Sequence, residues 1–143
     1  MIYIASDHGG FELKNIIISF LEGQGTEITD LGPTALDLDD DYPDYVKPLV
    51  QKVLEDPINK GVIICRNGIG VSMEANRNKS IRAGLSWNEK HAQSSRNDDN
   101  TNVLALPADY ITGDEALKIV KTWLKTPFST EEKFSRRLAK AEL

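Results

Sequence analysis

The sequence contains a single cysteine, Cys65, among 143 residues. One cysteine cannot form an internal disulfide, so we expect a fold that does not depend on an oxidising compartment. The only histidines, His8 and His91, lie far apart in the sequence. No group of residues has the spacing of a zinc site, and we expect no metal and no other cofactor. G-x-S-x-G and Walker-type loops are also missing, which argues against the commonest hydrolase and nucleotide-binding classes.

Long hydrophobic runs and an excess of positive charge are missing as well. The apolar stretches are a few residues long, whereas a membrane-spanning helix needs about 20. The start, MIYIASDHGG, lacks the basic residues and apolar run of a secretory signal peptide, so a cytoplasmic location is expected. The formal net charge of −5 argues against nucleic acids and anionic membranes as partners.

Short apolar runs alternate with segments of helical periodicity along the chain. Strands are expected at residues 2–6, 26–32, 60–65, 81–86 and 102–106. Helical patterns lie between these strands, and two more follow the last one. The alternation predicts an α/β fold with helices on both faces of a mostly parallel sheet. At this length we expect one domain over residues 1–143.

Two helices carry features that bear on their boundaries. Pro48 interrupts the apolar periodicity between Val46 and Leu54, which predicts a late helix start or a local kink. The last helix is expected after Pro127, over residues 129–143, with Ser129 or Thr130 as its cap.

Ligands of such folds collect at the carboxyl ends of the strands. The loop after the third strand, CRNGIG, combines Cys65 with Gly68 and Gly70 ahead of a helix. Backbone N–H groups there could hold a phosphate or a developing oxyanion, although the glycines could equally serve only the turn. A lone cysteine is more often a small buried hydrophobe, but the helix start and the adjacent Arg66 favour a thiolate.

Other polar residues allow both structural and functional interpretations. His8 follows Asp7 after the first strand, where it could bind a phosphate or orient a hydroxyl, or the pair could cap a helix. His91 lies in a polar helical stretch and is expected at the surface. Lys133 and Arg137 are four residues apart and share one helix face, either as a phosphate clamp or as a solvated basic end.

Five segments, in order, resemble the B-type ribose-5-phosphate isomerase family, which includes the galactose-6-phosphate isomerase subunits. They are SDHGGFELK, DYPDY, ICRNGIGVSMEANR, RNDDNTNVLAL and TPFSTEEKFSRRLAK. The resemblance covers essentially the whole chain. It implies a Rossmann-like three-layer αβα sandwich with a five-stranded parallel sheet and an extra C-terminal helix. It also implies a metal-free aldose–ketose isomerase of the pentose phosphate pathway, in a homodimer or a tetramer of two dimers, with sites shared between subunits.

The resemblance also implies a role for each matching residue. Cys65 is the base that removes the proton beside the substrate carbonyl, and the backbone amides of Gly68, Ile69 and Gly70 hold the enediolate. Residues that match substrate contacts are Asp7 and Tyr42 for the sugar, and His8, Lys133 and Arg137 for the phosphate. Val71 occupies the position where some members have a glutamate base, so this chain groups with the cysteine users.

Several positions depart from the family pattern. Arg66 and Asn67 replace the loop's usual glycine and hydroxyl residue, which leaves Asn67 as a candidate catalytic side chain. Asp98 stands for the ring-opening histidine, Asp99 for the following asparagine, and Asp109 for an arginine near the phosphate. We expect Asp98 to accept a proton from a ring hydroxyl. We hypothesise that Arg66 offsets the charge change by contacting the substrate, or Asp98 or Asp99 of the partner subunit.

The expected reaction is conversion of ribose 5-phosphate to ribulose 5-phosphate. Two alternatives stay open: isomerisation of another sugar phosphate of the hexose 6-phosphate type, or an inactive sugar-phosphate-binding paralogue. The loss of the ring-opening histidine favours the paralogue, whereas the intact cysteine loop favours an enzyme.

Overall fold

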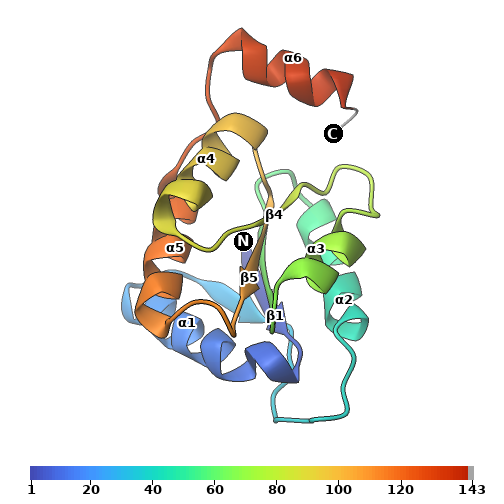
Figure 1. The fold of residues 1–143 in the computed structure, drawn as a ribbon, viewed down its shortest axis with the longest axis vertical. Helices are drawn as coiled ribbons and strands as arrows, with labels where there is room; N and C mark the ends of the chain where they lie inside the picture. The colour runs from blue at the N-terminus through green and yellow to red at the C-terminus, as the bar shows by residue number, and fades with distance from the viewer. Residues whose placement is uncertain (142–143) are drawn as a thin grey trace.

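A computed structural model describes residues 1–141 and arranges them around a parallel β-sheet (Figure 1). The strands follow the spatial order β2-β1-β3-β5-β4, and each neighbouring pair is parallel. Their bounds are Ile2–Ser6 for β1, Ile28–Asp30 for β2, Lys60–Cys65 for β3, Ala83–Leu85 for β4 and Val103–Pro107 for β5. The predicted five-stranded parallel sheet is confirmed for this part of the chain.

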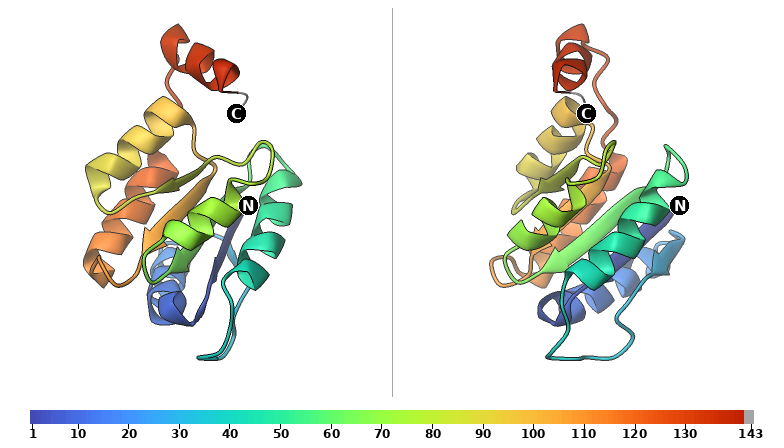
Figure 2. Two further views of the ribbon diagram at one scale, coloured as in Figure 1. Left: turned by 45° about the vertical axis from the view of Figure 1, so that its right-hand side comes forward. Right: turned by 90° about the vertical axis from the view of Figure 1, so that its right-hand side faces the viewer.

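Helices cover both faces of the sheet, as the two turned views show (Figure 2). One face carries α1 (Phe11–Gly23), α4 (Glu89–Asp99) and α5 (Gly113–Lys125), and the other carries α2 (Pro43–Leu54) and α3 (Ile69–Ala75). A short 3₁₀ turn, η1 (His8–Gly10), precedes α1, and α6 (Glu132–Lys140) ends the described chain. The predicted three-layer αβα sandwich with an extra C-terminal helix is confirmed.

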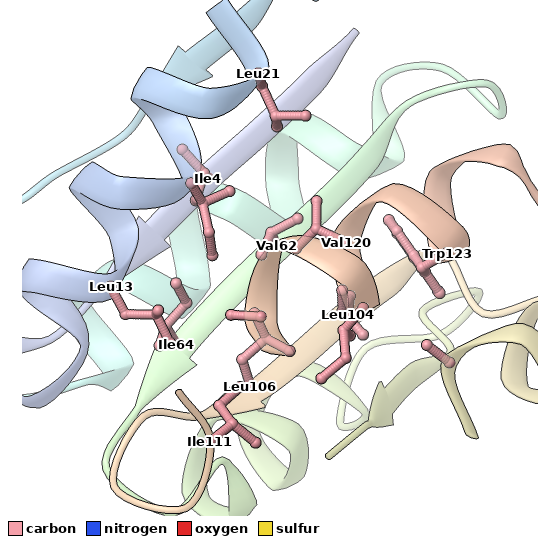
Figure 3. Packing of buried hydrophobic residues seen from close by; sticks show 14 residues of the cluster. Ile4, Leu13, Leu21, Val62, Ile64, Leu104, Leu106, Ile111, Val120 and Trp123 are labelled. Carbon is pink, nitrogen blue, oxygen red and sulfur yellow. The ribbon is translucent and has the colours of Figure 1, made fainter. Parts of the chain in front are cut away.

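Alternation along the central strands creates the two cores. Ile4, Val62, Ile64, Leu104 and Leu106 face α1 and α5 in one cluster (Figure 3). Their neighbours in the strands face the opposite helices, and those buried there are Ala5, Ile63, Cys65, Val103 and Ala105. Because strands β1, β3 and β5 are buried on both faces, they read as continuous apolar runs. Among residues 1–141, no helix is long and apolar enough to cross a membrane.

Three boundary predictions need correction. The edge strands β2 and β4 are shorter than expected, three residues each, since each pairs with a neighbour on one side only. Helix α2 begins at Pro43 and continues through Pro48, so the predicted late start is wrong. Pro43 is favourable because it occupies the first turn of the helix, where its missing N–H costs no hydrogen bond. Val46 and Leu49 are buried and anchor the helix on the sheet.

The cap predicted for the last helix is also wrong. Helix α6 starts at Glu132 with Glu131 as its N-cap. Ser129 instead donates its backbone N–H to the Asn97 carbonyl at 3.0 Å, and its hydroxyl accepts the Glu131 N–H at 3.1 Å. These bonds turn the chain before α6 begins. The predicted final residues, 142–143, lie outside the described part.

An acidic loop, residues 31–42, joins β2 to α2 and is fastened to the sheet at its beginning. The buried Lys14 donates to Asp30 Oδ2 at 2.6 Å and to the Pro33 carbonyl at 2.9 Å. Ser6 N–H donates to the Gly32 carbonyl at 3.1 Å, which continues the pairing beyond β2. The loop then passes below the carboxyl ends of the strands and returns to the molecule at Tyr42 (Figure 1).

Candidate active site

The strand order marks the place where a ligand is expected. Strand β2 lies on one side of β1 and β3 on the other, so the chain reverses direction across the sheet between β1 and β3. Crevices in open α/β sheets form at the carboxyl ends of such a pair. Two predicted loops meet here, the one that holds Asp7 and His8 and the one that holds Cys65 to Gly70.

The Cys65 loop is a tight turn from β3 into α3. Gly68 has φ +72°, in the left-handed region that favours glycine. A Cβ there would also collide with Leu85 Cδ1 and lie 3.2 Å from the Leu106 carbonyl carbon. Gly68 is therefore required by the turn, which is the structural interpretation that the sequence left open.

Inside this turn, the sulfur of Cys65 has defined partners. The Gly68 N–H donates to Sγ at 3.1 Å, and Sγ lies 3.9 Å from Asn67 Oδ1. The same Asn67 oxygen accepts the Ile69 N–H at 3.0 Å. Cys65 is 5% exposed, so the sulfur lies in a small polar niche at the edge of the core. An amide donor in this position stabilises negative charge on the sulfur.

Tyr42, at the end of the acidic loop, lies against the same turn. A Cβ at Gly70 would lie 2.7 Å from Tyr42 Cζ and 3.0 Å from its hydroxyl oxygen, so the ring rests directly on the glycine backbone. Tyr42 packs against the core cluster that contains Cys65. Gly70 therefore makes room for an aromatic side chain, and Tyr42, Gly70 and Cys65 share one side of the sheet edge.

Asp7 caps the 3₁₀ turn after β1. Its Oδ1 accepts the Gly10 N–H at 3.2 Å, and the residue is buried. Burial raises the pKa of Asp7, and the hydrogen bond from Gly10 opposes that rise. The capping role that the sequence allowed for Asp7 is confirmed.

His8 is held by a residue that the sequence did not single out. Its Nδ1 lies 2.6 Å from Asp40 Oδ1, and its backbone N–H donates to the same oxygen at 3.0 Å. The hydrogen bond to Asp40 raises the pKa of His8, and the charge of Asp7 adds to the effect. Burial would raise the pKa of Asp40, but the backbone and ring hydrogen bonds from His8 lower it overall. Asp40 is one of five aspartates between residues 37 and 44, so only the fold identifies it.

Arg66 points away from Cys65. Its guanidinium Nη1 lies 3.5 Å from Asp109 Oδ1, and its side chain packs on Gly9. Arg66, Asp109 and His8 line a cavity of about 450 Å³ beside α1, on the opposite side of the sheet edge from the Cys65 niche. No contact therefore supports the expected effect of Arg66 on the Cys65 thiol. Within the described chain, Arg66 pairs with Asp109.

The remaining predicted residues form a second group at the other end of the molecule. Asp98 and Asp99 end α4, which runs back toward the amino ends of the strands, and Lys133 and Arg137 belong to α6 beyond it (Figures 1 and 2). Burial and the neighbouring Asp98 raise the pKa of Asp99, while Arg137 opposes the rise. Lys133 pairs with Glu131 at 2.7 Å. The structure of one chain does not bring these four residues to Cys65.

The surroundings of His91 differ from the sequence prediction. His91 is half-buried rather than fully at the surface, because its ring stacks on Trp87 at 4.0 Å and its Nδ1 lies 3.1 Å from the Ser86 hydroxyl. In residues 1–141, no group of three or more His, Cys, Asp and Glu side chains is placed to hold a metal ion.

Comparisons with known proteins identify the family of the chain. The profile of the Ribose/Galactose Isomerase family matches residues 2–141. The chain is 46% identical over 127 residues to the probable ribose-5-phosphate isomerase B of Mycoplasma pneumoniae, covering 89% of this chain and 84% of that protein. Its structure is similar to ribose-5-phosphate isomerase B from Mycoplasma genitalium with bound ribulose-5-phosphate: TM-score 0.94, 40% identity, 99% and 93% of the two chains covered. A ribose 5-phosphate isomerase from Thermotoga maritima is similar too, with a TM-score of 0.93, 40% identity and 99% and 96% covered.

Proposed function

Since the chain belongs to the ribose/galactose isomerase family, we propose that it interconverts ribose 5-phosphate and ribulose 5-phosphate through an enediolate. The observation that carries this proposal is the Cys65 niche, where a thiol faces an amide donor at the carboxyl ends of β1 and β3. The similarity to a structure that contains ribulose-5-phosphate supports the choice of a pentose.

The residues of the niche can perform the proton transfer. Cys65, as a thiolate, takes the proton from C2 of the open-chain aldose, and the electron pair moves toward the carbonyl oxygen to form the enediolate. The proton of the C2 hydroxyl moves to the oxygen on C1, and the same sulfur returns a proton to C1, which gives the ketose. Aldose and ketose are isomers, so the reaction needs no oxidant and no reductant.

The amides that hold the enediolate are not equivalent. The Gly68 N–H is directed at the sulfur and the Ile69 N–H at Asn67 Oδ1. The Gly70 N–H has no acceptor among residues 1–141. We infer that the Gly70 N–H donates to the enediolate oxygen, and that the Gly68 N–H stabilises the Cys65 thiolate before proton transfer. Asn67 contributes to catalysis by fixing the turn, because its Oδ1 accepts the Ile69 N–H and lies next to the Cys65 sulfur.

The complete site is proposed to form between two subunits of a cytoplasmic homodimer. Lys133 and Arg137 of α6, with Asp98 and Asp99 at the end of α4, would reach the Cys65 loop from the partner subunit. In their own chain, α6 lies at the opposite end of the molecule from the loop between β3 and α3 (Figure 1). Large apolar side chains are exposed beside the loop and would be covered by the partner; they are Ile69, Met73, Trp87 and Tyr110. A reducing compartment would keep the Cys65 base a free thiol.

A substrate panel tests the proposed function. The purified protein, in the presence of a chelator, should convert ribose 5-phosphate with a kcat/KM at least about tenfold higher than for galactose 6-phosphate or other hexose 6-phosphates, because a pocket of fixed length discriminates against an added carbon. A hexose 6-phosphate that reacts faster would reject the pentose. Binding of both sugars without turnover would favour the inactive paralogue.

Replacement of Arg66 by alanine tests whether its guanidinium contacts the phosphate. We expect KM for ribose 5-phosphate to rise about tenfold, the loss of one charge-assisted contact, with a smaller change in kcat. Arg66→Lys should have an intermediate effect. Asp109→Asn should lower KM, because Asp109 competes with the phosphate for Arg66 and repels it. Initial-rate kinetics measure all three, and an unchanged KM and kcat in Arg66→Ala would reject the role.

A further inference from the structure

We propose that Asp40 is a positioning residue that holds the His8 ring with Nδ1 on its carboxylate and Nε2 toward the Arg66 cavity, as a cationic donor for the substrate phosphate. This inference rests on the proposed function, because the phosphate is that of the sugar phosphate. It assigns a role to a loop residue that makes no contact with the substrate itself.

Asp40 binds both the backbone and the ring of His8. One oxygen of Asp40 accepts both the His8 backbone N–H, at 3.0 Å, and the ring Nδ1, at 2.6 Å. The Asp40 side chain is 6% exposed and that of His8 is 22% exposed. The backbone contact fixes the carboxylate, and the carboxylate then sets the orientation of the ring. Nε2 is the ring nitrogen left for the cavity that His8 lines.

The same contact decides which proton His8 offers. A carboxylate accepts from Nδ1–H, so a neutral His8 would present the lone pair of Nε2 to the cavity and repel a phosphate oxygen. A protonated His8 presents Nε2–H, which donates to that oxygen. Phosphate binding therefore requires the imidazolium, and a carboxylate 2.6 Å away stabilises it.

The charged groups around His8 act in both directions. Asp40 and Asp7 favour the imidazolium, and Arg66, on the loop after β3, disfavours it. Glu12 and Asp109 also line the cavity. The net effect is a raised pKa of His8, so the positive charge persists to higher pH than for an ordinary histidine and is lost as the pH rises through that value.

Asp40→Asn removes the charge and retains an oxygen that can accept from His8. Histidine ring NMR should show a lower pKa of His8 than in the wild type, because the charge of the Asp40 carboxylate is gone, with the His91 resonances as internal control. The affinity for inorganic phosphate, and 1/KM for ribose 5-phosphate, should equal wild type at pH 6. Both should fall roughly fivefold below wild type at pH 8, where the variant has lost most of its imidazolium. Asp39→Asn, which removes an exposed charge one residue away, should match wild type throughout.

Three results would overturn the inference. The first is a His8 titration that does not change in Asp40→Asn. The second is a lowered pKa with unchanged phosphate affinity at pH 8. The third comes from the double variant: in a His8→Asn background, Asp40→Asn should have no further effect on phosphate binding, and an additional loss would assign Asp40 to the loop and not to His8. Normal phosphate binding with this pH dependence, but no turnover of ribose 5-phosphate, would reject the proposed function alone.

Discussion

Replacing Cys65 by alanine is expected to lower kcat for ribose 5-phosphate about a thousandfold, with little change in KM. A positioned general base contributes roughly 10²- to 10⁴-fold to a proton transfer. Among residues 1–141, the groups that contact the sulfur are the Asn67 side chain and the Gly68 amide, and neither can take a proton in its place. Initial rates of ketose formation measure the loss.

The controls separate catalysis from folding. Cys65 is small and 5% exposed, so Cys65→Ala should cost only about 1 kcal/mol of unfolding free energy and remain folded by circular dichroism. Cys65→Ser retains the shape and the amide contact but not a readily ionised group, and it should be nearly as inactive as alanine. A folded Cys65→Ala variant that retains more than a tenth of wild-type kcat would show that the base lies elsewhere.

Mixing two inactive variants is expected to restore activity if the site is shared. Cys65→Ala lacks the base, and the double variant Lys133→Ala/Arg137→Ala lacks the cations of α6. In a heterodimer of the two, one site receives Cys65 from one chain and both cations from the other. Random assortment should then recover roughly a quarter of wild-type activity, since half of the dimers are mixed and one of their two sites is intact. Co-refolding followed by initial-rate assays measures the recovery.

A matched pair of variants provides the control for this experiment. Cys65 and His8 belong to the same group in one chain. Cys65→Ala and His8→Asn therefore damage the same part of the site, and no mixed dimer of these two contains an undamaged site. This pair should show no recovery above the sum of the separate activities. If the α6 pair also shows none, while size measurements demonstrate mixed dimers, each site uses a single chain.

The sequence predicted the central strands better than the edges. Strands β1 and β3 have the expected bounds because they are buried on both faces and read as continuous apolar runs. Strands β2 and β4 have one neighbour each, and how far their pairing extends depends on the loops around them. The predicted start of α6 is wrong because the Ser129 N–H is bonded to the carbonyl of Asn97 in α4. This contact joins residues that are far apart in the sequence.

The candidate site was also predicted only in part, because side-chain contacts between distant segments cannot be read from the sequence. The rule that ligands bind at the carboxyl ends of strands selected two loops that the structure brings together, but it did not predict the directions of their side chains. Arg66 follows Cys65 directly, and alternation along a strand places the two on opposite sides, which the sequence pattern could have indicated. Asp40 could not be found this way, because its contact with His8 spans 32 residues and depends on the path of the acidic loop.

The most direct test of the central claim is to follow ribose 5-phosphate by NMR in D₂O with the wild-type protein and a chelator. An enediolate route predicts that ribulose 5-phosphate forms with deuterium at C1, and that remaining ribose 5-phosphate gains deuterium at C2, both depending on Cys65. A folded protein that binds the sugar phosphate but leaves the C2 proton in place, and forms no ketose, would contradict the account.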